Sequence, residues 1–254
     1  MTTNTEQITQ LIQSFNDLNT FFQGERGRLE QARSDLLSAV ESAMYFSGTV
    51  DPDNADPDPQ DGGTFASIKD LVNASPDGAY VRATLISGRV YEMTENVAVN
   101  GRVLRIEKSG AAANPVIKPQ PYENGASNYS RYFTLQGGEI VFDEVDIDLS
   151  APAANPANPF NVARACMVTY VEGASARVGL NGCTVTGADG RGLISVRAGT
   201  AAFVSIYNGT FDGSTYIVTD AAYGTAVIAK HSLTLANGAA IADGGTVGQN
   251  LLYN

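Results

Sequence analysis

The sequence predicts a mainly β protein with N-terminal α structure: a coiled-coil-like amphipathic helix followed by a short parallel β-solenoid. Three features of the 254 residues predict it. Apolar residues recur every three or four positions near the N-terminus, an acidic, proline-rich stretch follows, and the last hundred residues repeat at an interval of about 25. We therefore predict a helical oligomerisation and attachment segment at 1–47, an acidic Pro/Gly linker at 48–63 and a solenoid domain at 64–254.

The N-terminal segment has the clearest periodicity in the chain. Alternate steps of three and four residues from Ile8 meet an apolar residue at ten of eleven positions as far as Ala43, and Glu25 is the exception. An average spacing of 3.5 residues keeps such side chains on one seam of helices that supercoil around one another. The predicted oligomerisation seam is Ile8, Leu11, Phe15, Leu18, Phe22, Leu29 and Leu36.

Glu25 stands between two glycines, Gly24 and Gly27, which weaken a helix. The sequence alone leaves open a continuous helix, a bend or a hairpin at this point. Packing of the helix on the protein's own body is the alternative to self-association. Self-association is favoured because no other part of the chain has a matching helical pattern. Large seam residues are compatible with trimers, whereas the alanines after residue 30 suit close-packed dimers or a hairpin equally well.

Composition excludes two classes of partner. The formal net charge is −11, and the only lysines are Lys69, Lys108, Lys118 and Lys230, which form no cluster. Binding to nucleic acid or to anionic lipid depends on clustered basic residues, so we expect neither. The chain has no secretion-signal pattern and no apolar run approaching the roughly 18 residues of a membrane span. We therefore expect synthesis in the cytoplasm and no membrane insertion.

The stretch at 48–63 contains three prolines and five aspartates. Prolines interrupt a helix and the like charges repel, so we expect an extended, solvated linker. The aspartates suggest a calcium loop as an alternative, but their spacing fits neither an EF-hand nor a Gly-Gly-x-Gly-x-Asp repeat, and no metal site is predicted. The two cysteines, Cys166 and Cys183, are predicted to be buried thiols in adjacent strands, with a disulfide as the alternative.

The internal repeat aligns Ala176–Gly187 with Ala202–Gly213 and Ala226–Asn237. Each copy has an alternating strand, a Thr followed by an apolar residue, and a turn with Gly or Asn. Glu139–Asp148 resembles an earlier copy, before an insertion at 150–161, and Arg102–Ile106 is a candidate for one still earlier. Such units bury their apolar residues only by stacking, which favours a solenoid over an antiparallel sandwich or jelly roll.

No catalytic, cofactor-binding or metal-binding residue is predicted. Asp143, Glu144, Asp146 and Asp148 are the only candidate glycosidase carboxylates, and Asp146 and Asp148 are expected to share an outward face. No basic or aromatic residue is interleaved with them, which indicates a solvated strand face. His231 lies near no serine or cysteine motif, so we expect a surface position rather than a catalytic one.

The organisation resembles phage tail fibre and tailspike proteins. The likeness lies in the helical segment Thr5–Met44, the joint at 48–63, the pectate-lyase-like run Gly88-Arg-Val-Tyr-Glu-Met-Thr-Glu-Asn-Val, and the following Arg102-Val-Leu-Arg-Ile-Glu. The resemblance implies a right-handed parallel β-helix, a homotrimer, and an N-terminus docked on a virion platform protein. The chain has fewer turns than the depolymerising members, which counts against enzymatic activity.

We therefore expect a virion structural protein, a tail fibre or spike that is assembled in the host cytoplasm and adheres to the host surface. A host-surface glycan or receptor would be its outer partner, and no cofactor is expected. The alternatives are a capsid-bound head fibre or decoration protein, a tail adaptor, and a minimal polysaccharide-degrading tailspike enzyme. A bacterial cell-surface adhesin would normally require a secretion signal.

Overall fold

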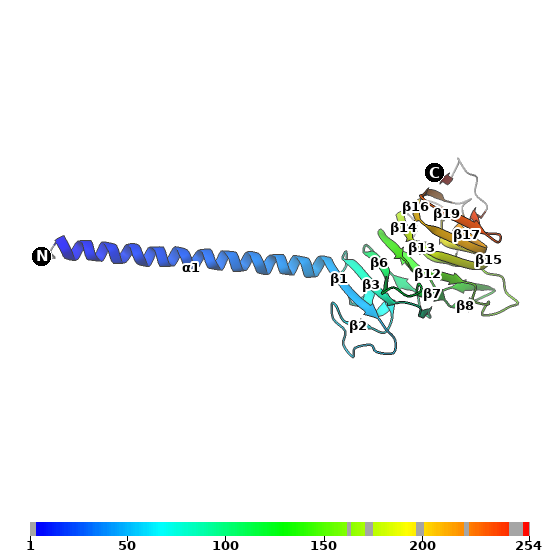
Figure 1. The fold of residues 1–254 in the computed structure, drawn as a ribbon, viewed down its shortest axis with the longest axis horizontal. Helices are drawn as coiled ribbons and strands as arrows, with labels where there is room; N and C mark the ends of the chain where they lie inside the picture. Colours follow the sequence, from blue (N-terminus) through cyan, green and yellow to red (C-terminus); the bar gives the residue numbers. More distant parts are fainter. Residues whose placement is uncertain are drawn as a thin grey trace. The chain divides into compact units, whose positions relative to one another are not determined.

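The computed structural model describes residues 4–161, 164–170, 175–196, 201–220, 224–243 and 251–253. The chain divides into two compact units, Met1–Met44 and Tyr45–Asn254. The fold is mainly β, with parallel sheets and a long N-terminal helix, as the sequence predicts (Figure 1).

Helix α1 (Asn4–Met44) is one continuous helix of 41 residues, so the predicted alternatives of a bend or hairpin at the glycine pair are wrong. Two ion pairs, each about one turn apart, span Gly27: Arg28 lies 3.0 Å from Glu25, and Arg26 lies 2.8 Å from Glu30. Each glycine costs a helix only about 1 kcal/mol relative to alanine, which the surrounding good helix formers offset. At a rise of about 1.5 Å per residue, α1 is roughly 60 Å long.

The helical segment ends at Met44 rather than 47, and 48–63 does not link two units. The chain passes from α1 directly into strand β1 (Tyr45–Val50), whose apolar alternation buries Phe46 and Val50. The acidic residues then form a loop within the β unit, which returns to strand β2 (Thr64–Phe65) beside β1.

Hydrogen bonds to backbone N–H groups fold this acidic loop back. The Asp61 carboxylate accepts from the backbone N–H of Ser47 at 2.7 Å, and the Asp56 carboxylate accepts from that of Thr64 at 2.7 Å. Asp51 is buried in an ion pair with Arg89. The aspartates are therefore held by specific partners instead of repelling one another along an extended path.

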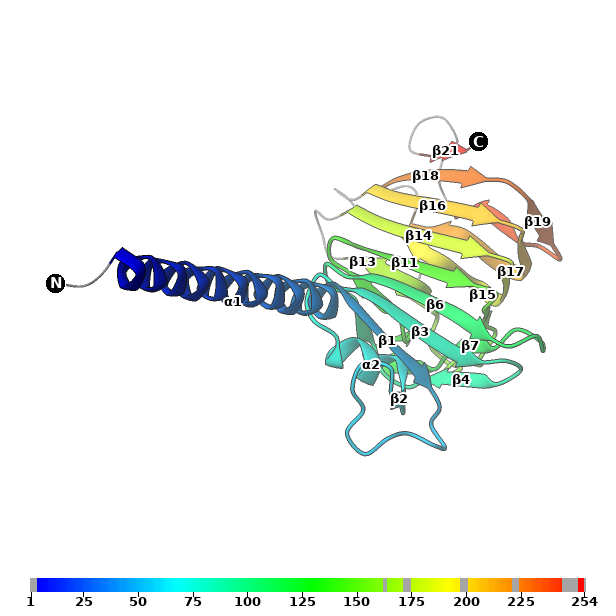
Figure 2. The same cartoon turned by 60° about the vertical axis from the view of Figure 1, so that its left-hand side comes forward.

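The first of the two main sheets runs through the whole β unit and is parallel throughout. Nine strands lie side by side in the order β2-β1-β3-β6-β11-β14-β16-β18-β21, and in Figure 2 their arrows run the same way. Beyond β1 and β2, its members are β3 (Tyr80–Ile86), β6 (Val103–Ser109), β11 (Gly138–Asp143), β14 (Ser175–Asn181), β16 (Ala201–Tyr207), β18 (Thr225–Lys230) and β21 (Leu251–Tyr253). We call it the nine-stranded sheet.

The second sheet has ten strands, all paired in parallel, and the chain alternates between the two sheets. Its strands are β4 (Val90–Met93), β5 (Val97–Ala98), β7 (Val116–Pro119), β10 (Phe133–Leu135), β12 (Asp146–Leu149), β13 (Cys166–Tyr170), β15 (Thr184–Ser195), β17 (Gly209–Thr219), β19 (Leu233–Ala236) and β20 (Ala240–Ala242). Among the described strands, only β8 (Pro121–Asn124) and β9 (Ser127–Ser130) pair antiparallel. The sandwich and jelly-roll alternatives are therefore wrong.

The strand register confirms the internal repeat. Ala176 pairs with Ala202, and Ala202 pairs with Ala226. Glu139 pairs with Arg177 on the following strand and with Val103 on the preceding one, which places both suggested earlier copies in the same stack. The predicted turns are found only in part: Asn237 lies in a turn, whereas Gly187 and Gly213 lie within the long strands β15 and β17. Gly213 has a φ of +81°, and a Cβ there would lie 2.3 Å from the carbonyl oxygen of Gly187, so only glycine fits.

The core consists of in-facing residues that repeat from strand to strand. One such row runs through Leu104, Ile140, Val178, Val204 and Ile228, all of which are buried. Stacked rows of this kind bury apolar side chains that no single repeat could cover.

Cys166 and Cys183 are buried and form no disulfide, which confirms the thiol prediction over the disulfide alternative. Cys166 lies on β13, but Cys183 lies just before β15 and not in a strand, so the predicted placement in adjacent strands is only partly correct. Burial raises the pKa of Cys166 to about 12 and that of Cys183 to about 11.

A short helix, α2 (Ile68–Ala74), packs beside the first strands of the β unit. The sequence predicts a brief helix at 64–72, but Thr64 and Phe65 pair with β1, so the helix begins later. The Ser67 side chain accepts a hydrogen bond from the backbone N–H of Asp70 and caps its first turn. Its apolar residues, Ile68, Leu71 and Val72, are buried.

Candidate interaction surfaces

The predicted oligomerisation seam lies along α1 and is exposed in the single chain. All seven residues have more than 45% of their surface exposed, from 49% at Leu18 to 71% at Phe15 and Leu29. Large apolar side chains normally leave water on folding, and a contiguous exposed set marks an interaction surface. The seam therefore provides apolar contact area for a partner.

The exposed apolar surface of α1 includes more residues than the predicted seam. Five more large apolar residues of α1 are exposed: Ile12, Phe21, Leu37, Val40 and Met44. They flank the seam at neighbouring helical positions, and Ile12 follows Ile8 by four residues. A search for apolar residues four positions after each seam residue would have found Ile12 and Val40, but not Phe21 or Leu37.

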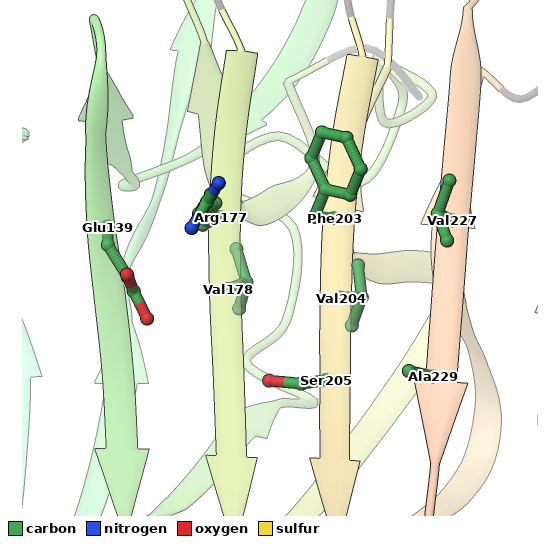
Figure 3. A pocket seen from close by; sticks show the side chains of 8 residues that line it. All are labelled: Glu139, Arg177, Val178, Phe203, Val204, Ser205, Val227 and Ala229. Atoms are coloured by element: carbon green, nitrogen blue, oxygen red, sulfur yellow. The ribbon is translucent and has the colours of Figure 1, made fainter.

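A second candidate surface is the outward face of the nine-stranded sheet. Strand register aligns Glu139, Arg177, Phe203 and Val227 in one row across four adjacent strands (Figure 3). The next outward row holds smaller side chains, Val141, Gly179, Ser205 and Ala229, and the row beyond contains Asp143, Asn181 and Tyr207. Small residues between two rows of larger ones create a shallow depression, which we call the sheet groove.

Two adjoining hollows make up the sheet groove. One, of about 360 Å³, is bordered by Arg177 and Phe203, with Ser205 and Ala229 between the strands. The other, of about 440 Å³, is bordered by Tyr207 and His231 and shares Ser205 and Ala229. The groove thus crosses the strands, because both hollows take residues from at least three of them.

Aromatic rings form both borders of the sheet groove. The Tyr207 and His231 rings stack with centroids 4.7 Å apart and an interplanar angle of 8°, which places His231 at the surface as predicted. Phe203 is 45% exposed, and the Arg177 guanidinium lies 5.9 Å from its ring centroid. Within the described residues Arg177 and Glu139 form no ion pair, although they are register neighbours. The groove therefore combines apolar ring faces with two charged side chains that are not paired with each other.

The four candidate carboxylates are each engaged in the stack. Asp143 pairs with Arg105, Glu144 lies 2.8 Å from Lys108, and Asp148 lies 3.3 Å from Lys118. Asp146 accepts hydrogen bonds from the Asn114 side chain at 3.0 Å and from the Thr184 backbone N–H at 2.8 Å. Asp146 and Asp148 do share a face, as predicted. Basic partners come from preceding strands, which the sequence of the segment itself does not reveal.

The pKa of Asp148 shows the effect of its structural partners. Burial raises the pKa of its carboxyl, but hydrogen bonds from Ser150 and the charge of Lys118 outweigh that effect and leave the pKa below its ordinary value. A general acid needs the opposite shift, towards neutral pH.

Arg191 is a buried arginine on β15. Its side chain is completely buried, its Nη2 donates to the Ala151 carbonyl at 2.6 Å, and its guanidinium lies 4.3 Å from the Phe160 ring centroid. Burial lowers its pKa to about 10. Arg191 thereby fastens the insertion at 150–161 to the stack.

Within the ranges described, no group of three or more His, Cys, Asp or Glu side chains is arranged to hold a metal ion. The same residues include no helix with the length and apolar character needed to cross a membrane. No protein family, no curated protein and no solved structure matches this chain.

Proposed function

We propose that this chain is a non-enzymatic structural protein of a phage particle that self-associates through α1 and presents its β unit as an adhesive surface. The observation on which the proposal depends is the exposure of twelve large apolar side chains on one 41-residue helix. A helix gains most of its stability by packing an apolar face, so α1 requires a partner of similar length. A second copy supplies one.

We further propose that the β unit is a short right-handed β-helix. The support is that the chain alternates between the sheets and each return adds a strand beside the previous one. In addition, β15 pairs with β12 through Val185 and with β13 through Ile194, so one long strand contributes to two faces of a turn. Stacked turns of this kind resist local opening, which suits a protein that works outside the cell.

The proposed adhesive surface is the sheet groove, and the proposed outer partner is a host-surface glycan. Exposed rings of Phe203 and Tyr207 offer apolar faces to sugar rings, while Arg177 and Asn181 offer hydrogen-bond donors to hydroxyl groups. A non-enzymatic role is favoured over a minimal polysaccharide-degrading enzyme because Asp143, Glu144, Asp146 and Asp148 are held by structural partners.

Attachment to a virion platform protein through the N-terminal helices is proposed from the likeness to tail fibres and tailspikes. A head fibre, a decoration protein or a tail adaptor would likewise attach through α1 and present the β unit. The likeness implies three copies, whereas the seam residues of α1 favour two, and a direct mass measurement distinguishes these numbers.

The mass of the full-length protein by light scattering, compared with that of a chain lacking residues 1–44, tests self-association. We expect an oligomer that becomes a monomer on deletion. Leu18→Glu, which places a charge in the seam, should shift the full-length protein towards monomer at least tenfold in dissociation constant. Asn16→Glu adds the same charge on the polar side of α1 and should leave the mass unchanged. A monomeric full-length protein would refute the proposal.

A further inference from the structure

We infer that two copies of α1 pair in antiparallel orientation along their whole length, with Ile8 of one helix opposite the partner's Ala39. The inference depends on the self-association proposed above and adds the direction and register of the pair. It follows from the sizes of the seam residues, from their charges and from the area available.

Seam residues differ in size between the two halves of α1. The N-terminal half contains Ile8, Leu11, Phe15, Leu18 and Phe22, whereas the C-terminal half contains Leu29, Ala32, Leu36 and Ala39. In a parallel pair each residue meets its own copy, so two phenylalanines meet at positions 15 and 22 and two alanines meet at positions 32 and 39. The helices would then be forced apart in one half and leave voids in the other.

The antiparallel register matches large residues with small ones. Phe15 lies opposite the partner's Ala32, and Ile8 lies opposite the partner's Ala39. Leu18 lies opposite the partner's Leu29, and the two-fold axis repeats each contact. Every layer between these positions then has a similar total volume, which a constant interhelical distance of about 8–10 Å requires.

Charge also favours the antiparallel pair. A parallel pair places two Glu25 carboxylates together in the seam and sets Arg28 beside the partner's Arg33, since these are the flanking positions that meet in parallel helices. Like charges in such positions destabilise a helix pair. The antiparallel register removes both contacts.

In that register Glu25 faces the partner's Phe22 and keeps its own ion pair with Arg28 at 3.0 Å. Arg28 also comes beside the partner's Phe21, where a cation–π contact is available. The same side of the pair brings Ser14 beside the partner's Asp35, which accepts hydrogen bonds. No like-charged residues meet at these flanking positions.

The exposed area is large enough for a stable pair. An interface of standard size removes about 800 Å² from each partner. Phe15, Phe21 and Phe22 are 71%, 59% and 60% exposed. Since a phenylalanine buries about 150–250 Å², the three together supply roughly 300 Å² or more. The other nine exposed apolar residues of α1 supply the remainder.

Spin labels on the full-length protein test the direction of pairing. A nitroxide is attached to Gln10→Cys, and the distance between the two labels is measured by pulsed electron paramagnetic resonance. Antiparallel helices place position 10 opposite position 37 of the other copy, so the labels should lie about 40 Å apart. Parallel helices should bring them within about 20 Å. Cys166 and Cys183 are buried thiols, and the unmodified chain treated with label is the blank.

Gln23→Cys is the matched control because position 23 lies near the middle of α1, so its labels should be close together in either orientation. A dimer with a distance of about 40 Å at position 10 and a short distance at position 23 supports the inference. A short distance at both positions, in a dimer or a trimer, overturns it and leaves the proposed self-association intact. A monomer by mass overturns both.

Discussion

At the scale of single residues, Arg191 shows how the stack supports an insertion. A completely buried guanidinium is costly when a donor is left unsatisfied. Arg191 offsets part of that cost through the Ala151 carbonyl and the Phe160 ring, whereas its buried Nη1 has no hydrogen-bond partner among the described residues. Both partners belong to the insertion at 150–161, which has few regular elements of its own. One side chain therefore joins an irregular segment to a regular core.

Replacing Arg191 with alanine should lower the free energy of unfolding by about 3 kcal/mol, because it leaves a cavity and an unpaired buried carbonyl. Chemical denaturation monitored by circular dichroism measures this change. Arg177→Ala removes an exposed arginine from β14, in the other sheet, and should change stability by less than about 0.5 kcal/mol. Equal effects of the two substitutions would contradict the role given to Arg191.

At the scale of elements, the parallel strands are held together by rows of in-facing side chains. Val204 on β16 is buried between Val178 and Ile228, whereas Val227 on the adjacent strand β18 faces outward. The same residue type thus occupies both environments in neighbouring strands. Comparing the same substitution at both positions therefore separates the effect of burial from the intrinsic strand preference of valine.

Val204→Ala should reduce the free energy of unfolding by about 2 kcal/mol, the transfer and cavity cost of two buried methyl groups. Val227→Ala should cost less than about 0.5 kcal/mol, since that side chain faces the sheet groove. Equilibrium denaturation of both variants measures the difference. A larger effect at Val227 would indicate that the outward face is covered in the isolated protein.

At the scale of the whole molecule, ion pairs join adjacent parallel strands of the β unit that are distant in the sequence. Arg105 connects to Asp143, Lys108 to Glu144 and Lys118 to Asp148, each across more than 25 residues of sequence. The pairs use two of the four lysines of an acidic chain whose net charge is −11. Acid therefore acts on contacts that hold strands distant in the sequence together.

Stability of the β unit should fall as the pH decreases from about 5 to 3. The folded pKa of Asp148 lies below its ordinary value, so its contribution is fully present above the unfolded pKa of about 3.9 and is lost as the pH falls through the folded pKa. Denaturation midpoints across this range should decline less steeply for Asp148→Asn than for the natural chain. Parallel curves would show that Asp148 does not contribute to the acid sensitivity.

Much of the architecture was accessible from the sequence because it depends on local periodicity. The apolar spacing from Ile8 onward predicts α1, and the alignment of Ala176, Ala202 and Ala226 predicts the strand register that the structure has. Both patterns repeat many times, so a single exception such as Glu25 does not obscure them. The buried state of Cys183 follows from its place in the same repeat.

Features that the sequence alone did not predict depend on residues distant in the chain. The acidic loop is folded back because the Ser47 backbone N–H binds Asp61 and Arg89 binds Asp51. The carboxylates after Phe142 appear unpaired until stacking brings Arg105, Lys108 and Lys118 beside them. The sheet groove likewise exists only where pairing of β14, β16 and β18 aligns Gly179, Ser205 and Ala229.

The sequence by itself thus determined the helix, the repeat and its register, because hydrophobic burial acts on every copy of a periodic pattern. Only the tertiary structure decided which charges are paired and where the outward face is hollow. The continuation of α1 through Gly24 and Gly27 is local secondary structure, which the sequence pattern had left open. Charge pairing and surface shape depend on the distances between particular atoms, which are established only once the strands are stacked.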